Sequence, residues 1–377
     1  MSGTVRFSRN PFVAPRLPRE LLAPPEDVRA FHRTLPGYAP TPLVELPALA
    51  KELALGRVFL KDESKRFGLN AFKGLGASYA IHRVMKANPG RSFTFATATD
   101  GNHGRAVAWS AKRLGQKAVI FVPKNTVPAR IAAIRGEGAE VVVVDGNYDD
   151  TVKRAAEQAA KAGWQVISDT AWPGYMEIPG WIMAGYETLF AEAEEQRLAA
   201  RAPAFDAILL QAGVGGLAYA GVIHANRGSG VRPTLICVEP TDADCLLESI
   251  LSKDGSIQQA KGKQNSIMAG LNCGTPSLLA WPAIRAGVDF FLAVDDSFAE
   301  EAMRRLARPK GGDPAVVSGE SGAAGLAGLL ALCKEPSLAA ERAELAMGKH
   351  SNVLLISTEG DTDPANYARI VDRDLMK

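Results

Sequence analysis

The chain has 377 residues, enough for two domains or one large α/β unit. Its 43 Lys and Arg residues balance 41 Asp and Glu residues, and no basic stripe alternates with aromatic residues, so nucleic acid is not an expected partner. No apolar run reaches the length of a membrane span, and the first residues lack the apolar core of a signal peptide. We therefore expect a cytoplasmic globular protein without a membrane partner, with an enzyme as the default class.

Residues 1–40 are rich in proline and poor in periodic apolar positions, which predicts an irregular arm packed on the body. After this arm, short apolar runs alternate with helical patterns. The predicted strands are residues 58–61, 93–98, 118–122, 140–144, 165–168, 207–211, 235–239, 289–294 and 353–357. The predicted helices include residues 104–114, 129–136, 149–162, 178–201, 217–226 and 323–333. Continuous apolar strands separated by helices indicate parallel sheets that are covered on both faces.

The predicted strands divide into two groups. Those between residues 93 and 168 follow a strict strand–helix rhythm that suffices for one small open sheet, and the others can form a larger sheet. We therefore predict an α/β fold with two open, mostly parallel sheets. Residues 1–90 and 190–377 would form a large domain, and residues 91–189 a smaller inserted α/β domain. Ligands in such folds bind outside the carboxyl ends of the strands, and each motif below follows a predicted strand.

Lys73 follows the first predicted strand and a polar loop, and it stands at the first turn of a predicted helix. The positive end of the helix dipole disfavours a charged amine, so we expect the pKa of Lys73 to be lowered. A neutral amine can attack a carbonyl, which makes Lys73 a candidate catalytic residue. The alternative is a lysine on the solvated surface.

A glycine-rich loop follows the strand 207–211 and opens a helix. The residues of this loop are Gly213, Val214, Gly215, Gly216 and Leu217. Backbone N–H groups at a helix N-terminus favour an anion, so the loop is a candidate phosphate site. With Ala218 it also matches a dinucleotide fingerprint, and Glu239 ends the next strand where a ribose ligand would stand. A nicotinamide dehydrogenase and a purely structural turn therefore stay open as alternatives.

Three more motifs follow predicted strands. Asp100 and Asn102 stand where the strand 93–98 gives way to a helix, either as part of a carboxylate-binding loop or as an Asx turn that caps the helix. The neighbouring His103 is expected to be a cap or packing residue. Asp169 follows the strand 165–168, and a turn residue is its alternative role. The run Ser-Thr-Glu-Gly at 357–360 follows the last predicted strand and presents hydroxyl and carboxylate groups.

Together these motifs resemble the fold-type II pyridoxal-phosphate (PLP) enzymes over roughly residues 38–364. The markers are Asn70-Ala-Phe-Lys73, Gly101-Asn102-His103, the glycine loop and the run at 357–360. Within that group the chain is most similar to the diaminopropionate ammonia-lyase family, through the runs at 66–73, 99–104, 169–172 and 359–364. Serine and threonine dehydratases usually carry Ser where this chain has Asp100.

The resemblance implies a PLP cofactor between the two domains, held by Lys73 as a Schiff base and by its phosphate on the glycine loop. It implies that Asn102 binds the ring 3-oxygen and that Thr358, or Ser357 one position earlier, faces the ring nitrogen. A neutral hydroxyl at the ring nitrogen suits β-elimination better than transamination. A homodimer is also implied.

The reaction implied is α,β-elimination of D- or L-2,3-diaminopropionate to pyruvate and two ammonia. Asp100 and Asp169 are the candidates for holding the β-ammonium that leaves. Lys73 would be the base for the L form and Asp100 the base for the D form. Because Asp100 would stand beside the substrate carboxylate, its pKa should be raised.

Two further alternatives belong to the same fold. One is a serine/threonine dehydratase or β-replacement synthase, and the other is a PLP-binding protein without turnover. No metal is predicted, because Cys237, Cys245, Cys273 and Cys333 lack metal-ligand spacing. A contribution of Glu320 to a metal site is left open.

Overall fold

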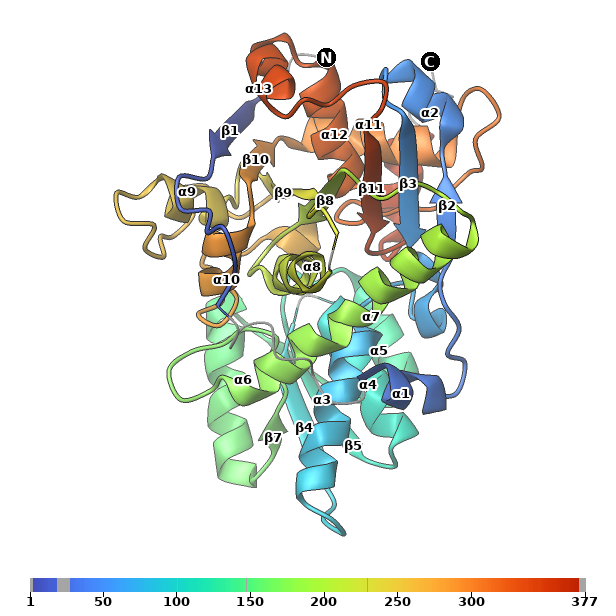
Figure 1. Cartoon of the computed structure of the whole chain (residues 1–377). Coiled ribbons are helices and arrows are strands. Elements are labelled where there is room, and N and C mark those ends of the chain that lie inside the picture. The colour runs from blue at the N-terminus through green and yellow to red at the C-terminus, as the bar shows by residue number, and fades with distance from the viewer. Residues whose placement is uncertain (1–2, 19–27, 100, 147, 229, 373–377) are drawn as a thin grey trace.

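The computed structural model of the protein describes residues 3–18, 28–99, 101–146, 148–228 and 230–372. Within these residues the strands form one seven-stranded sheet and one four-stranded sheet, and helices surround both (Figure 1). The predicted α/β fold with two open, mostly parallel sheets is confirmed. No helix in the described part of the chain has the length and apolarity that a bilayer crossing requires.

The larger sheet has the strand order β1-β10-β9-β8-β11-β3-β2. Its strands are β1 (Val5–Arg9), β2 (Leu43–Glu45), β3 (Arg57–Asp62), β8 (Ala207–Gln211), β9 (Thr234–Pro240), β10 (Phe290–Val294) and β11 (Asn352–Ser357). The inner strands run parallel, whereas β1 and β2 pair antiparallel at the two edges. The inner strands are almost completely buried, which explains why they read as continuous apolar runs.

The N-terminal residues are not the irregular arm that the sequence predicts. Strand β1 pairs with β10, with Val5 opposite Val294 and Arg9 opposite Phe290. Helix α1 (Val28–Thr34) packs against α3 and α7. The strand β1 was missed although Val5-Arg6-Phe7-Ser8 alternates apolar and polar residues, because the run is short and its partner strand is far away in the sequence.

The smaller sheet has the order β6-β5-β4-β7, and all its strands are parallel. They are β4 (Thr94–Ala98), β5 (Lys117–Pro123), β6 (Glu140–Val144) and β7 (Gln165–Val166). The connecting helices are α4 (Asn102–Arg113), α5 (Pro128–Gly136) and α6 (Tyr148–Ala162). These strands lie inside the predicted insertion 91–189, but α7 (Glu177–Ala199) runs through its predicted end, so the domain boundaries stay a prediction.

The remaining helices lie outside the crossovers of the smaller sheet, and among them α3 packs against α4 and α7. They are α2 (Pro47–Glu52), α3 (Gly74–Ala87), α8 (Gly216–Arg227), α9 (Cys245–Leu251), α10 (Trp281–Gly287), α11 (Asp296–Ala307), α12 (Ala324–Lys334), α13 (Ala339–Glu344) and α14 (Pro364–Val371), with 3-10 turns η2 (Glu63–Gly68), η3 (Ala269–Leu271) and η4 (Pro336–Leu338).

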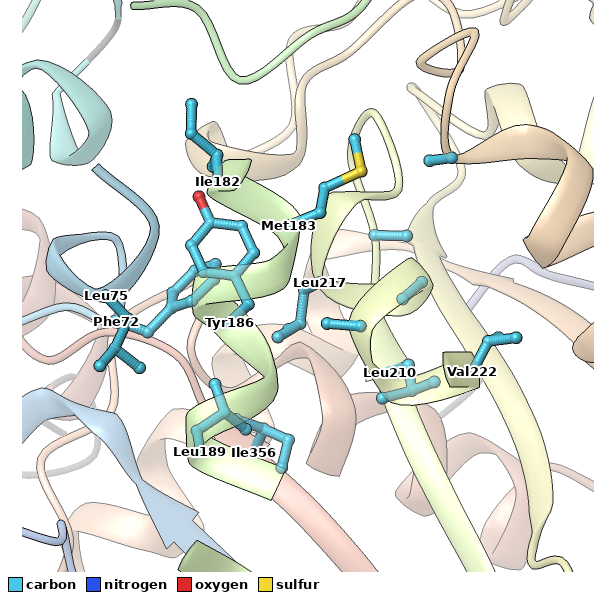
Figure 2. Close-up of a cluster of buried hydrophobic side chains, with 14 of the residues drawn as sticks. Phe72, Leu75, Ile182, Met183, Tyr186, Leu189, Leu210, Leu217, Val222 and Ile356 are labelled. Atoms are coloured by element: carbon cyan, nitrogen blue, oxygen red, sulfur yellow. The ribbon is translucent and has the colours of Figure 1, made fainter. Parts of the chain in front are cut away.

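Helix α7 runs diagonally across the molecule and packs against both α3 and α8 (Figure 1). Figure 2 shows Met183 and Tyr186 of α7 near Phe72, which precedes α3, and Leu217 of α8. These side chains belong to one buried apolar cluster. The segment after β3 and the start of α8 are therefore held against the same helix, which brings the Lys73 segment close to the glycine loop.

Candidate functional site

The predicted motifs converge at the carboxyl ends of the strands of both sheets. The backbone N–H of Phe72 donates to the carbonyl of Thr358 at 3.1 Å, which joins the segment after β3 to the end of β11. The Gln211 amide donates to Thr358 Oγ1 at 3.2 Å, which joins β8 to the same point. From the smaller sheet, the Asn102 amide donates to the Glu359 carboxylate. Four loops that are distant in the sequence thus form one site between the sheets.

Lys73 and Asp169 form an ion pair at this site. Lys73 directly precedes α3, and its Nζ donates to Asp169 Oδ2 at 2.7 Å. Burial lowers the pKa of Lys73, but the Asp169 carboxylate more than reverses this and raises it above its usual range. Burial conversely raises the pKa of Asp169, but Lys73 outweighs it and holds that pKa below its usual range. Both groups are therefore charged in this structure.

The lowered pKa predicted for Lys73 is thus wrong. Lys73 does stand at the start of α3, as the sequence predicts. A helix terminus, however, changes the free energy of a nearby charge by only about 0.3–1 kcal/mol. An opposite charge at 4 Å contributes about 4 kcal/mol at the effective dielectric constant near a protein surface. The Asp169 carboxylate therefore determines the charge of Lys73, and Asp169 follows a strand of the smaller sheet whereas Lys73 follows a strand of the larger one.

Two aromatic rings form the walls around the Lys73 amine. Nζ lies 5.3 Å from the ring centre of Phe72 and 5.7 Å from that of Tyr186. A Cβ on Gly216 would lie 3.6 Å from Cε2 of Tyr186, so the Tyr186 ring lies beside both Lys73 and the glycine loop. Tyr186 is not predictable as a site residue from the sequence, because a tyrosine in a largely apolar helix has the same pattern as a core residue.

His103 also reaches the ion pair. Its Nε2 lies 2.8 Å from the carbonyl oxygen of Ile167, so this nitrogen carries the proton and donates. Its Nδ1 lies 3.9 Å from Asp169 Oδ2. The expected packing role is therefore incomplete, since His103 also faces a candidate catalytic carboxylate. Nothing in the local sequence signals this contact, because Asp169 follows a different strand.

The glycine loop has the geometry of an anion cradle. Gly215 has a φ of +96°, which side chains rarely adopt, and it precedes the first turn of α8. A Cβ on Gly213 would lie 2.7 Å from Cys273 Sγ. The first N–H groups of a helix have no acceptor within the helix, so they are available to a phosphate. The glycines are needed both for the turn and for the close packing of the loop.

The dinucleotide alternative fails at Glu239. This residue is fully buried, and its carboxylate accepts from the backbone N–H groups of Leu246 at 2.8 Å and Leu247 at 2.9 Å. Burial raises the pKa of Glu239 well above its usual range, although the two N–H donors oppose the shift. Glu239 therefore caps the start of α9 and does not extend toward a ribose.

The remaining predicted residues have mixed outcomes. Thr358 Oγ1 lies 3.4 Å from the Ser321 carbonyl, and Ser357 Oγ lies 2.8 Å from Ser318 Oγ, so both hydroxyls are engaged and the choice between them for the ring nitrogen stays a prediction. Asp100 lies outside the described residues. In the part of the chain that is described, no three His, Cys, Asp or Glu side chains are grouped as metal ligands.

The residues present fit a PLP molecule. The site combines an amine on Lys73, a glycine cradle that a Cβ would fill, an amide on Asn102 and a hydroxyl on Thr358. These groups match the aldehyde, the phosphate, the ring oxygen and the ring nitrogen of that cofactor in kind.

Comparisons with known proteins agree with this fit. The profile of the pyridoxal-phosphate dependent enzymes matches residues 34–348. The diaminopropionate ammonia-lyase of Escherichia coli K12 is 45% identical over 362 residues, which cover 91% of this chain and 90% of the relative. That of Salmonella typhimurium is 43% identical over 369 residues, covering 92% and 91% of the two chains.

A solved structure shows the same relationship. The crystal structure of the Escherichia coli enzyme in complex with an aminoacrylate–PLP azomethine reaction intermediate superposes with a TM-score of 0.91 at 42% identity. The match covers 99% of this chain and 98% of that one. The chain therefore belongs to the diaminopropionate ammonia-lyases, within the pyridoxal-phosphate dependent enzymes.

Proposed function

We propose that the protein is a PLP-dependent lyase that converts 2,3-diaminopropionate and water into pyruvate and two ammonia. The observation that carries the proposal is the Asp169 carboxylate, which binds an ammonium group in a site suited to PLP. The similarity to enzymes named for this reaction supports the same substrate. When bound, PLP supplies the electron sink that stabilises negative charge at the substrate Cα.

Asp169 is proposed to bind the β-ammonium of the substrate. In this structure its ammonium partner is Lys73 Nζ at 2.7 Å, and the pKa of Asp169 is low because burial, which would raise it, is outweighed by Lys73. An ionised carboxylate can hold the β-ammonium of the substrate by a charge-assisted hydrogen bond when Lys73 is no longer present as an ammonium. The β-nitrogen then stays protonated and leaves as ammonia.

Lys73 and Asp100 are proposed as the bases that remove the Cα proton, Lys73 for the L form and Asp100 for the D form. Gly213, Val214, Gly215, Gly216 and Leu217 are proposed to hold the phosphate. Asn102 and Thr358 are proposed to hold the ring 3-oxygen and the ring nitrogen. The assignment of Asp169 is supported by the geometry above, and the assignments of Lys73 and Asp100 as bases by the resemblance alone.

The test begins with the purified protein and its visible spectrum. We expect a yellow chromophore that borohydride reduction fixes to the peptide containing Lys73. Lys73→Met should abolish this trapping, whereas Lys86→Met, an exposed lysine in the last turn of the same helix, should not. A protein that cannot be loaded with PLP would refute the proposal.

The substrate is tested by turnover of D- and L-diaminopropionate against D- and L-serine. We expect two ammonia per pyruvate from diaminopropionate, and faster turnover than with serine. Preferential use of serine would instead support the dehydratase alternative. Asp100→Asn should reduce turnover of the D form more than that of the L form, and an equal loss would refute the assignment of two bases.

We also propose that the enzyme is a cytoplasmic homodimer. The family resemblance supports the dimer, and the metabolic enzymes to which the chain is similar support the location. Sedimentation equilibrium of the PLP-loaded protein tests the first proposal, with twice the chain mass of 40.0 kDa as the expected result.

A further inference from the structure

Glu359 is a buried carboxylate that the proposed mechanism does not use. It follows β11 directly, and its side chain is only 1% exposed. Oε1 accepts from the backbone N–H of Ser321 at 3.1 Å, and Oε2 accepts from the Thr362 hydroxyl at 3.1 Å and from the Asn102 amide. Burying a carboxylate so deeply is costly unless hydrogen-bond donors satisfy it, so the identity of its donors indicates what it is bound to.

The three donors come from different parts of the molecule. Ser321 and Thr362 belong, like Glu359, to loops beside the larger sheet. Asn102 is the first residue of α4, the helix that follows strand β4 of the smaller sheet. The Glu359 side chain therefore connects the two sheets at the site itself. The backbone reinforces this position, because Glu359 forms an isolated antiparallel bridge with Ala71, two residues before Lys73.

The contact restricts the Asn102 amide. A carboxylate only accepts, so it binds the NH₂ end of the amide and disfavours the flipped orientation. The Asn102 nitrogen carries two hydrogens, and it donates one of them in the hydrogen bond to Glu359. The second hydrogen and the amide oxygen remain for other partners. The charge on Glu359 thus determines which donor and acceptor pattern Asn102 can present.

We propose that Glu359 is a positioning residue for the cofactor, which acts by fixing the amide orientation of Asn102. The inference rests on the proposed function in that Asn102 binds the ring 3-oxygen of PLP. Residues that orient a ligand-binding group typically change affinity on the order of 10-fold to 100-fold when they are replaced, as documented for metal sites. Glu359 is not itself placed against the substrate or the cofactor.

The experiment compares PLP-loaded variants of the full chain by two readouts that do not need turnover. These are the rate at which PLP is lost on dialysis and the pH midpoint of the visible absorption band. Glu359→Gln should release PLP on the order of 10-fold faster and shift the midpoint, because the uncharged amide no longer imposes one orientation on Asn102. Glu359→Asp keeps the charge and should restore part of both properties.

Thr362→Val is the matched control. It removes another hydrogen bond to the same Glu359 oxygen but leaves Asn102 in place. We expect PLP release to change less than about 2-fold and the pH midpoint by less than a few tenths of a pH unit, because the Asn102 amide keeps its hydrogen bond to Glu359 and hence its orientation. Equal effects of Thr362→Val and Glu359→Gln would overturn the proposal, because the carboxylate would then act by packing alone.

A double-mutant cycle decides whether Glu359 acts through Asn102. In an Asn102→Ala background, Glu359→Gln should have almost no further effect on either readout. Fully additive effects would overturn the proposal, as would a Glu359→Gln protein with wild-type PLP retention. If Glu359→Gln does not fold, the cycle is run with Glu359→Asp, and fully additive effects of Glu359→Asp and Asn102→Ala would overturn the proposal.

The inference and the proposed function fail in different ways. A wild-type protein that retains PLP but does not consume diaminopropionate would refute the function and leave the cycle interpretable. A wild-type enzyme that consumes diaminopropionate while Glu359→Gln and Asn102→Ala act independently would refute the inference alone.

Discussion

The charge of Lys73 depends on a residue that the sequence places almost a hundred positions away. The Lys73 amine is an ammonium because Asp169 pairs with it, and His103 approaches the same carboxylate from another helix. The carboxylate is therefore already arranged to bind a cation. A lyase that must expel a protonated amine needs such a group at the place where the amine leaves.

Replacing Asp169 tests this at the level of one residue. Asp169→Asn should reduce diaminopropionate turnover on the order of 100-fold or more, because an amide cannot hold the β-ammonium by an ionic hydrogen bond. Asp145→Asn, which breaks an exposed ion pair with Lys124, should leave turnover unchanged. Steady-state rates with diaminopropionate and serine provide the measurement. An equal loss with serine would show that Asp169 acts on Lys73 and not on the β-ammonium.

The glycine loop is the element where backbone conformation matters most. Gly215→Ala should destabilise the fold by about 1–3 kcal/mol, because alanine at a φ of +96° is strained. The added Cβ would also lie 2.5 Å from Ile284 Cδ1, although that side-chain tip can move. Gly228→Ala, at the other end of α8, is the control. Gly228 has a φ of −63°, and a Cβ added there would meet no atom of the described residues within 4 Å.

Thermal unfolding and PLP retention measure both glycine variants. We expect Gly215→Ala to lose stability and cofactor, and Gly228→Ala to resemble the wild type. If the two variants retained PLP equally well, the loop geometry would not be required for the cofactor.

A buried ionic cluster joins helix α7 to the segment that leads to Lys73. Its members are Lys61, Glu63, Arg66 and Glu192, whose side chains are all fully buried. Arg66 Nη2 donates to Glu192 at 2.7 Å and to Glu63 at 2.8 Å, and Lys61 Nζ lies 2.8 Å from Glu192. The two positive charges are balanced by two negative charges, so the loss of one member leaves an uncompensated charge in the interior.

Glu192→Ala should therefore lower the free energy of unfolding by about 3–5 kcal/mol. Glu194→Ala, on the same helix, removes a partly exposed pair with Arg197 and should cost less than about 1 kcal/mol. Equilibrium denaturation in urea compares the two. Equal losses would mean that the buried cluster contributes no more than a surface ion pair.

At the scale of the whole molecule, the stability should depend on pH through Glu187. Burial raises the pKa of Glu187 from 4.5 to about 7, although Arg227 opposes the shift. The folded protein then binds a proton that the unfolded chain releases between these two pH values. The free energy of unfolding should fall as pH rises from about 4.5 to 7, by on the order of 3 kcal/mol from this group.

Glu187→Gln should flatten that part of the stability curve, because glutamine does not titrate. Glu195→Gln should not flatten it, since the Arg29 hydrogen bond lowers the pKa of Glu195 and moves its contribution to lower pH. Thermal unfolding at several pH values provides the measurement. A curve that keeps its slope in Glu187→Gln would assign the dependence to another group.

Most of the inner strands and the kinds of chemistry that follow them could be predicted from the sequence. Strands β3, β8 and β11 were predictable because a strand buried on both faces must be apolar throughout. Lys73, the glycine loop and Asp169 were predictable as candidates because each follows a predicted strand, Lys73 after an intervening polar loop. These features depend on residues that are adjacent in the chain.

Only the tertiary structure decided how these features act on one another. In the folded chain β1 pairs with β10, and the Glu239 carboxylate accepts hydrogen bonds at the start of α9. Lys73 is a cation because it pairs with Asp169. Glu359 accepts a hydrogen bond from Asn102. Each of these outcomes depends on groups that come from separate strands or helices. A pKa or a hydrogen bond is set by distance in space, and the order of residues in one chain does not specify that distance.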